Sequence, residues 1–315
     1  NQDGDKIIYM AMRMPDGYVG KPPELANKVF TPIAGSSGAP LYKSNNHVVD
    51  FTLQKSAYAS GTSDWYLTTR SRSGNLLRPN TLNAEESNTY QVFDYQSGAS
   101  SYTGGDGSRF SWLFKRGPSL DIVQYTGTGS SLTVDHSLNA LPDMIWTKEL
   151  TNSSTEWKIH VRELGAGNIL RLNNNLAQET GQTQYQNTNP TATQFFVSSS
   201  LSTNTSMYTA ILFKSISGVS KIGTYTGSGS IQTITTGFQP RFLMAKVATT
   251  TGDWMLFDTV RGWASGNDQA LKINEDTAQD STYDYCDPTS TGFTINISGN
   301  ALNGDGETYI YFAHA

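Results

Sequence analysis

The chain has 315 residues with 22 basic and 27 acidic side chains, which gives a formal net charge of −5 at neutral pH. Charges of both signs are interspersed, so the electrostatic footprint of a nucleic-acid-binding protein is absent. The chain has one cysteine, Cys286, which excludes an intramolecular disulfide framework. It contains no run of 18 apolar residues, the length needed to span a membrane as a helix. We expect Cys286 to be a small apolar core residue, with a reactive thiol as the alternative.

The composition indicates a β protein. Only 16% of the residues are charged, against roughly 25% in ordinary soluble domains. Ser, Thr, Asn, Gln and Gly take their place, and this mixture suits short strands joined by many turns. The length predicts two or three domains of about 100–150 residues each.

The beginning of the chain resembles its end at a constant offset of 302 positions. The two segments are Asn1-Gln2-Asp3-Gly4-Asp5-Lys6-Ile7-Ile8-Tyr9-Met10-Ala11 and Asn303-Gly304-Asp305-Gly306-Glu307-Thr308-Tyr309-Ile310-Tyr311-Phe312-Ala313. If the second segment closes a domain, residues 1–13 should be the closing strand of a preceding repeat, and the chain would be the tail part of a longer polypeptide. Alternatively, this strand completes a neighbouring subunit or the chain's own first domain by strand addition.

Residues 14–47 contain five of the 11 prolines, so regular strands are not expected for most of this segment. Apolar residues such as Tyr18, Val29 and Phe30 predict an ordered connection that lies over the first domain. A disordered linker is the alternative, although such a linker would contain fewer apolar residues.

Three copies of a unit of about 100 residues account for the remainder of the chain. Trp65, Trp157 and Trp254 mark the same point in each copy. Leu-Arg-Leu-Asn at 170–173 recurs as Leu-Lys-Ile-Asn at 271–274, and Leu-Arg-Pro-Asn at 77–80 is a weaker first copy. The predicted organisation is the proline-rich connection plus repeat 1 at 14–117, repeat 2 at 118–218 and repeat 3 at 219–315.

Alternating apolar and polar residues predict strands with one buried face. Trp157, Ile159 and Val161 lie on one side of such a strand, and the intervening residues, His160 among them, lie on the wet side. Seven or eight short strands per copy, bounded by turn residues, indicate an all-β fold of three tandem β-sandwich repeats with a jelly-roll-like topology. Because the three tryptophans recur, we expect them to be core residues, with sugar stacking as the alternative.

The sequence resembles a known family. The segment Arg13-Met14-Pro15-Asp16-Gly17-Tyr18-Val19-Gly20-Lys21-Pro22-Pro23-Glu24, with Tyr125-Thr126-Gly127-Thr128-Gly129 and Pro142-Asp143-Met144-Ile145-Trp146-Thr147-Lys148, is similar to repeat-bearing virion proteins of marine tailed bacteriophages. The resemblance covers nearly the whole chain and implies a structural or appendage protein of the phage particle. It implies no settled active site, so no functional residue is carried over from it.

Motifs for chemistry are sparse. The four histidines lack partners at metal-ligand spacing, and we expect neither a metal nor a cofactor. The two Tyr-Thr-Gly-x-Gly segments are interpreted as strand-to-turn punctuation rather than phosphate loops, and a Gly-x-Ser-x-Gly nucleophile elbow is absent. The acids at 85–86 and 275–287 are interpreted as solvated loop residues, with a calcium site and catalytic carboxylates as alternatives.

Recognition is expected on loops that do not recur between copies. Trp263, Tyr283 and Tyr285, on loops of the third repeat, are the candidate ligand-binding residues. We expect a non-enzymatic virion structural protein, either a tail fibre or another host-facing appendage. Alternatives are a lectin-like carbohydrate-binding module, a capsid decoration protein and a polysaccharide-degrading enzyme. The expected partners are other virion proteins, further copies of the chain and a host surface glycan, without nucleic acid or membrane insertion.

Overall fold

The computed structural model describes residues 25–36, 40–44, 46–57, 63–88, 92–93, 95–99 and 109–315. In these ranges the regular structure is almost entirely β, with 23 strands and four short 3-10 helices. The helices are η1 (Ala26–Lys28), η2 (Arg70–Arg72), η3 (Arg162–Leu164) and η4 (Ser199–Leu201). None of the helices within the described ranges is long and apolar enough to cross a bilayer. The predicted all-β class and the scarcity of helix are confirmed.

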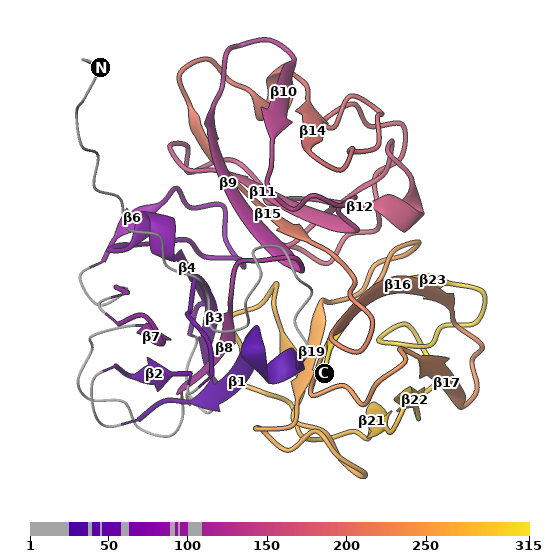
Figure 1. The fold of residues 1–315 in the computed structure, drawn as a ribbon. Coiled ribbons are helices and arrows are strands. Elements are labelled where there is room, and N and C mark those ends of the chain that lie inside the picture. The colour runs from indigo at the N-terminus through magenta and orange to yellow at the C-terminus, as the bar shows by residue number, and fades with distance from the viewer. Residues whose placement is uncertain are drawn as a thin grey trace, which may run out of the picture.

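Three larger antiparallel sheets form the framework, one in each of three lobes (Figure 1). The first lobe has the strand order β1-β8-β3-β4, the second β9-β15-β11-β12-β13 and the third β16-β23-β18-β19-β20. Their bounds are β1 (Phe30–Ala34), β3 (Phe51–Ser56), β4 (Tyr66–Thr69), β8 (Arg109–Phe114), β9 (Leu120–Thr126), β11 (Met144–Glu149), β12 (Lys158–Val161), β13 (Ile169–Arg171), β15 (Met207–Phe213), β16 (Ser220–Thr226), β18 (Phe242–Val247), β19 (Met255–Asp258), β20 (Leu271–Lys272) and β23 (Thr308–His314). In all three lobes the last strand lies beside the first, so the same order recurs.

A smaller sheet covers the outer face of each larger one. In the first lobe β2 (Tyr42–Lys43) pairs with β7 (Gly98–Ala99), and in the second β10 (Leu132–Asp135) pairs with β14 (Gln194–Val197). The third lobe has the order β17-β22-β21, formed by Gln232–Thr235, Gly292–Ile295 and Cys286–Thr289. A further pair in the first lobe joins β5 (Asn75–Leu76) to β6 (Glu86–Ser87).

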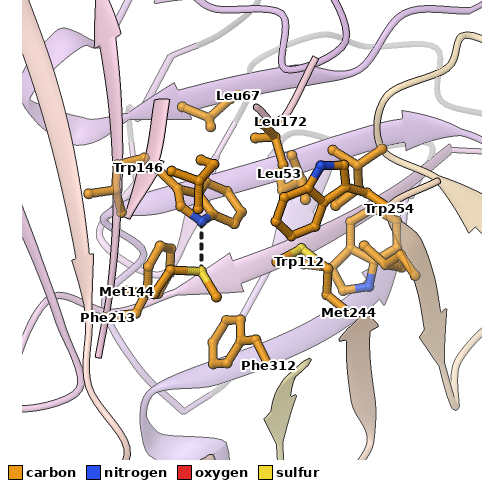
Figure 2. Packing of buried hydrophobic residues seen from close by; sticks show 14 of the residues in the cluster. Leu53, Leu67, Trp112, Met144, Trp146, Leu172, Phe213, Met244, Trp254 and Phe312 are labelled. Atoms are coloured by element: carbon orange, nitrogen blue, oxygen red, sulfur yellow. Dashed lines mark hydrogen bonds between the residues drawn. The ribbon is translucent and has the colours of Figure 1, made fainter. Parts of the chain in front are cut away.

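The inner faces of the three larger sheets share one hydrophobic core. Trp112 comes from the first lobe, Trp146 and Phe213 from the second and Phe312 from the third, and each is at most 3% exposed. Figure 2 shows these side chains meeting, with the indole N–H of Trp146 2.9 Å from the sulfur of Met144. Each sheet therefore buries its inner face only in the presence of the other two lobes.

The outer face of each larger sheet packs on the smaller sheet of its own lobe, so both faces are buried. Within β11, Trp146 points to the shared core and Ile145 to the core of the second lobe. The wet position predicted for His160 is therefore wrong. This side chain is fully buried and its ring centroid lies 5.2 Å from that of Tyr185. A polar residue on a strand indicates a solvent-exposed face only when no second layer of structure covers that face.

The proline-rich segment supplies a strand to the first lobe. β1 pairs with β8 and holds the place that β9 and β16 hold in the other lobes. Pro32 is tolerated there because β1 is an edge strand, with no partner beyond it among the described residues. The prediction that residues 14–47 form a connection largely without regular strands missed this strand. The predicted closing strand at 1–13, and residues 14–24 of the connection, lie outside the described residues, and the repeat boundaries stay predictions.

The recurring Tyr-Thr-Gly-x-Gly segment ends the opening strand in the second and third lobes. A Cβ on Gly127 would lie 2.0 Å from the main-chain oxygen of Thr203, and one on Gly227 would lie 2.1 Å from that of Gly304. Only glycine permits this close approach of two backbones. The second glycine has a positive φ in both lobes, 79° and 65°. The prediction of strand-to-turn punctuation is confirmed.

Candidate functional site

A cyclic set of hydrogen bonds, here called the tryptophan ring, joins the three lobes. In each bond an indole N–H donates to a main-chain oxygen of the preceding lobe, and the third lobe precedes the first. The bonds run from Trp157 Nε1 to Arg78 O (3.1 Å), from Trp254 Nε1 to Arg171 O (2.8 Å) and from Trp65 Nε1 to Lys272 O (2.9 Å). All three tryptophans have no exposed surface, so their predicted core role is confirmed.

The Leu-Arg-Leu-Asn echoes found in the sequence form the acceptor side of this ring. Their asparagine accepts the main-chain N–H of the tryptophan in its own lobe, at Asn80 (3.1 Å), Asn173 (3.0 Å) and Asn274 (2.8 Å). Farther along the same loops, main-chain bonds reach the next lobe from Glu85 N to Leu150 O (2.8 Å), Gln178 N to Ala248 O (2.7 Å) and Gln279 N to Ala57 O (3.0 Å). The repeated motif is therefore a docking element between lobes.

Three buried lysines lie beside the tryptophan ring. Lys55, Lys148 and Lys246 are at most 2% exposed, and burial lowers the pKa of each to about 8. Lys148 Nζ donates to the main-chain oxygens of Leu82 (2.9 Å) and Thr155 (2.6 Å), so it joins the first and second lobes. The ammonium groups donate to neutral main-chain oxygens at the lobe boundaries. We therefore interpret the three lysines as structural residues.

The sequence-based prediction missed these lysines. A usable signal was present, because a lysine precedes each recurring tryptophan by 10, 9 and 8 positions in the three copies. Recurrence alone would have assigned them to the architecture, as it did for the tryptophans. Their burial follows only from the packing of one lobe on the next.

The structure separates the three predicted ligand-binding residues. Trp263 is only 1% exposed, and its indole N–H donates to the main-chain oxygen of Cys286 at 2.6 Å. Tyr285 is 6% exposed, so both rings belong to the core of the third lobe and present no face to a sugar. A position on loops predicted exposure for Trp263 and Tyr285. That prediction is wrong, since both rings pack into the core of the third lobe. Tyr283 is 57% exposed, and a ligand role stays a prediction for it.

The acids of the third lobe are tied to protein donors. Asp284 and Asp287 both accept the side-chain amide of Asn296, at 2.6 and 3.0 Å. Buried Asp268 accepts the two main-chain N–H groups that follow Asp284, yet burial raises its pKa to about 7, with the charges of Asp284 and Asp287 adding to the effect. No group of three or more His, Cys, Asp or Glu side chains in the described part of the chain is arranged to hold a metal ion.

A groove of about 740 Å³ lies beside two of the connections between lobes, and its wall includes residues 116–118, 137–140 and 214–216. Asp121 accepts the main-chain N–H of Ser137 (2.7 Å) and the guanidinium of Arg116 (2.5 Å). Burial would raise the pKa of Asp121, but these two donors lower it below its ordinary value. Lys214 is likewise 3.3 Å from Asp143. The groove wall thus combines compensated charges with apolar side chains, Pro118, Leu138 and Ile216 among them.

Comparison with known proteins gives one family. No curated protein matches the chain. The family model described as a domain of unknown function (DUF7483) matches residues 54–315, from the middle of β3 to the last residue. This match covers 262 of the 315 residues and takes in the tryptophan ring. The chain therefore belongs to the DUF7483 family.

Proposed function

We propose that this chain is a non-enzymatic structural protein of a tailed-bacteriophage virion, a tail fibre or another host-facing appendage that displays its loops for attachment. The sequence resemblance to repeat-bearing phage virion proteins supports the class of protein. The observation that carries the role is the tryptophan ring, which ties three lobes into one body with a shared core. A body closed in this way holds its outer loops in fixed relative positions.

We further propose that the three lobes are copies of one jelly-roll-like sandwich unit. The recurring strand order and the equivalent bonds at each lobe boundary support this origin. Under this proposal the residues shared between copies serve the architecture, and residues that differ between copies are free to recognise a partner. Many copies on one particle would give strong attachment even when each single contact is weak.

Localisation on the particle tests the proposal. An antibody raised against residues 118–315 is applied to purified phage particles that carry this gene, and gold label is located by electron microscopy. The proposal predicts label on the tail or its tip. Label on the head would favour a capsid decoration protein instead. Protein found only free in the lysate would contradict any virion role.

A lectin-like module is the second candidate, and one observation favours it. Tyr283 lies on a loop of the third lobe with 57% of its surface exposed and stands edge-on to Tyr285, with ring centroids 5.6 Å apart. An exposed aromatic ring held by a second ring is a suitable platform for a sugar face. Binding of free protein to a glycan array, without any label on particles, would favour this candidate.

A further inference from the structure

A basic and an acidic residue recur eight positions apart beside the tryptophan ring. The pairs are Arg78 and Glu86, Arg171 and Glu179, and Lys272 and Asp280. In the first lobe Arg78 donates twice to Glu86, at 2.9 Å for each bond, and its guanidinium lies 5.4 Å from the ring centre of Tyr66. In the second lobe Arg171 forms an ion pair with Glu179. Two lobes thus close this position with an arginine–glutamate bridge.

The third lobe leaves the same position open. Lys272 pairs with Asp253 at 2.8 Å, as Arg78 pairs with Asp64 and Arg171 with Glu156 in the other lobes. It also lies 3.4 Å from Glu275, but it makes no bond to Asp280. Asp280 instead accepts the main-chain N–H of Thr282 and the hydroxyl of Tyr285, each at 2.9 Å. The shorter side chains of lysine and aspartate do not bridge the gap that arginine and glutamate bridge elsewhere.

A pocket of about 370 Å³ opens as a result, here called the third-lobe pocket. Met255 and Ala270 form its apolar floor, and Lys272, Glu275 and Asp280 are among its polar walls. The strand register puts Met255 at the position that Tyr66 occupies in the first lobe and Lys158 in the second. Lys158 forms an ion pair with Glu156. The volume lies at the lower end of the roughly 300–1,000 Å³ typical of small-ligand sites.

The chemistry of the walls selects a class of ligand. Asp280 and Glu275 offer carboxylate oxygens as acceptors, and Lys272 offers an ammonium donor. Two acids against one base disfavour phosphates and carboxylic acids, while the small floor leaves no room for a large apolar group. A ring that carries several hydroxyls and one apolar face matches this set. Asp280 is held in place by the hydroxyl of Tyr285, whose ring packs edge-on against exposed Tyr283.

We propose that the third-lobe pocket binds one terminal pyranose of an uncharged glycan. Its biological meaning rests on the proposed host-facing role, but the binding itself is measured on purified protein. Failure to bind a sugar would leave the virion assignment intact, and absence from particles would leave the binding result intact.

The test uses methyl pyranosides of glucose, galactose, mannose and N-acetylglucosamine, observed by saturation-transfer NMR and titrated for affinity. For one of them we expect a Kd on the order of 1 mM, as suits a single small sugar. The double variant Lys272→Arg/Asp280→Glu copies the closed position of the first lobe and should weaken binding by about tenfold or more. The matched control, Arg171→Lys/Glu179→Asp, makes the reverse exchange in the second lobe, where Lys158 takes the place of Met255, and it should keep the affinity of the third-lobe pocket.

Thr277→Arg, at the exposed mouth of the pocket, is a second blocking variant should the double variant not fold. Weaker binding in either folded blocking variant, with the control unchanged, supports the proposal. No binding of any of the four sugars to the wild-type protein would overturn it. Equal binding by a folded blocking variant would also overturn it, as would binding of ethanolamine in place of the sugars.

Discussion

Trp254 donates its indole N–H to the main-chain oxygen of Arg171, 83 positions earlier in the chain, at 2.8 Å. The bond crosses from the third lobe to the second and has counterparts at both other lobe boundaries. Because the donor is buried, the bond has no solvent substitute. The tryptophan is itself anchored in the third lobe, because its main-chain N–H donates to the side chain of Asn274 at 2.8 Å.

Trp157→Ala should lower the free energy of unfolding by roughly 3–5 kcal/mol, as expected for loss of a buried aromatic side chain. Trp157→Phe keeps much of the packing but leaves the Arg78 oxygen without its donor, and about 2 kcal/mol should be lost. Urea unfolding followed by tryptophan fluorescence and circular dichroism measures both. A neutral result for Trp157→Ala would place this side chain outside the core.

His160→Phe should stabilise the protein. Both ring nitrogens of His160 are buried without a partner, and the third lobe has Phe257 at the equivalent position of its sheet. Removing two unsatisfied polar atoms should add about 1–2 kcal/mol at pH 7, measured by chemical denaturation. A less stable variant would mean that a buried water or another donor satisfies this imidazole.

The gain from His160→Phe should be larger at pH 5. Burial and the nearby Arg162 charge lower the pKa of His160 to about 4, whereas an unfolded histidine titrates near 6.5. Between these values the unfolded state binds the proton, so the wild type loses stability as the pH falls and the variant does not. The difference between the two proteins should grow by about 1–2 kcal/mol from pH 7 to pH 5. An unchanged difference would show that His160 titrates normally in the fold.

Stability should rise on the alkaline side of neutrality. The three buried lysines have pKa values of about 8 in the fold and about 10.4 when unfolded, so the unfolded state holds more protons between these limits. Burial raises the pKa of Cys286, which acts in the opposite direction above pH 8.5. A net gain of about 4 kcal/mol is expected from pH 7 to 9.5 by urea unfolding.

Lys148→Met serves as the control for this pH dependence because it removes one of the three titrating groups. Its unfolding free energy should rise less between pH 7 and 9.5 than that of the wild type. An identical rise in both proteins would assign the effect to other groups. Above pH 10 the trend should reverse, because burial raises the pKa of Tyr125 and Tyr185 and keeps them protonated in the fold.

Recurrence and alternation were the informative sequence signals. The recurring tryptophans predicted buried positions, and the short apolar segments between turn residues predicted an all-β fold. Both inferences depend on local pattern and on comparison of one copy with another. The Leu-Arg-Leu-Asn echo was visible as well, although its use as a docking element required the position of the neighbouring lobe.

What the sequence did not predict depends on long-range packing. A period of two separates the faces of a strand but cannot tell that both faces are covered, so His160 was assigned to solvent. Trp263 is on a loop with polar neighbours, and only the fold shows that its ring enters the core. β1 was missed because its proline argues against a strand, although an edge position tolerates it. The third-lobe pocket arises from two conservative exchanges, Lys272 and Asp280, that leave no distinct motif.

The shared core makes one prediction that is specific to this architecture. If each larger sheet buries its inner face only against the other two, the three lobes should unfold together, and a single lobe should not fold alone. Differential scanning calorimetry of residues 25–315 measures this directly. We predict one transition whose calorimetric and van't Hoff enthalpies agree, and no cooperative transition for residues 118–218 alone. Two or three separable transitions, or a folded isolated second lobe, would contradict the account.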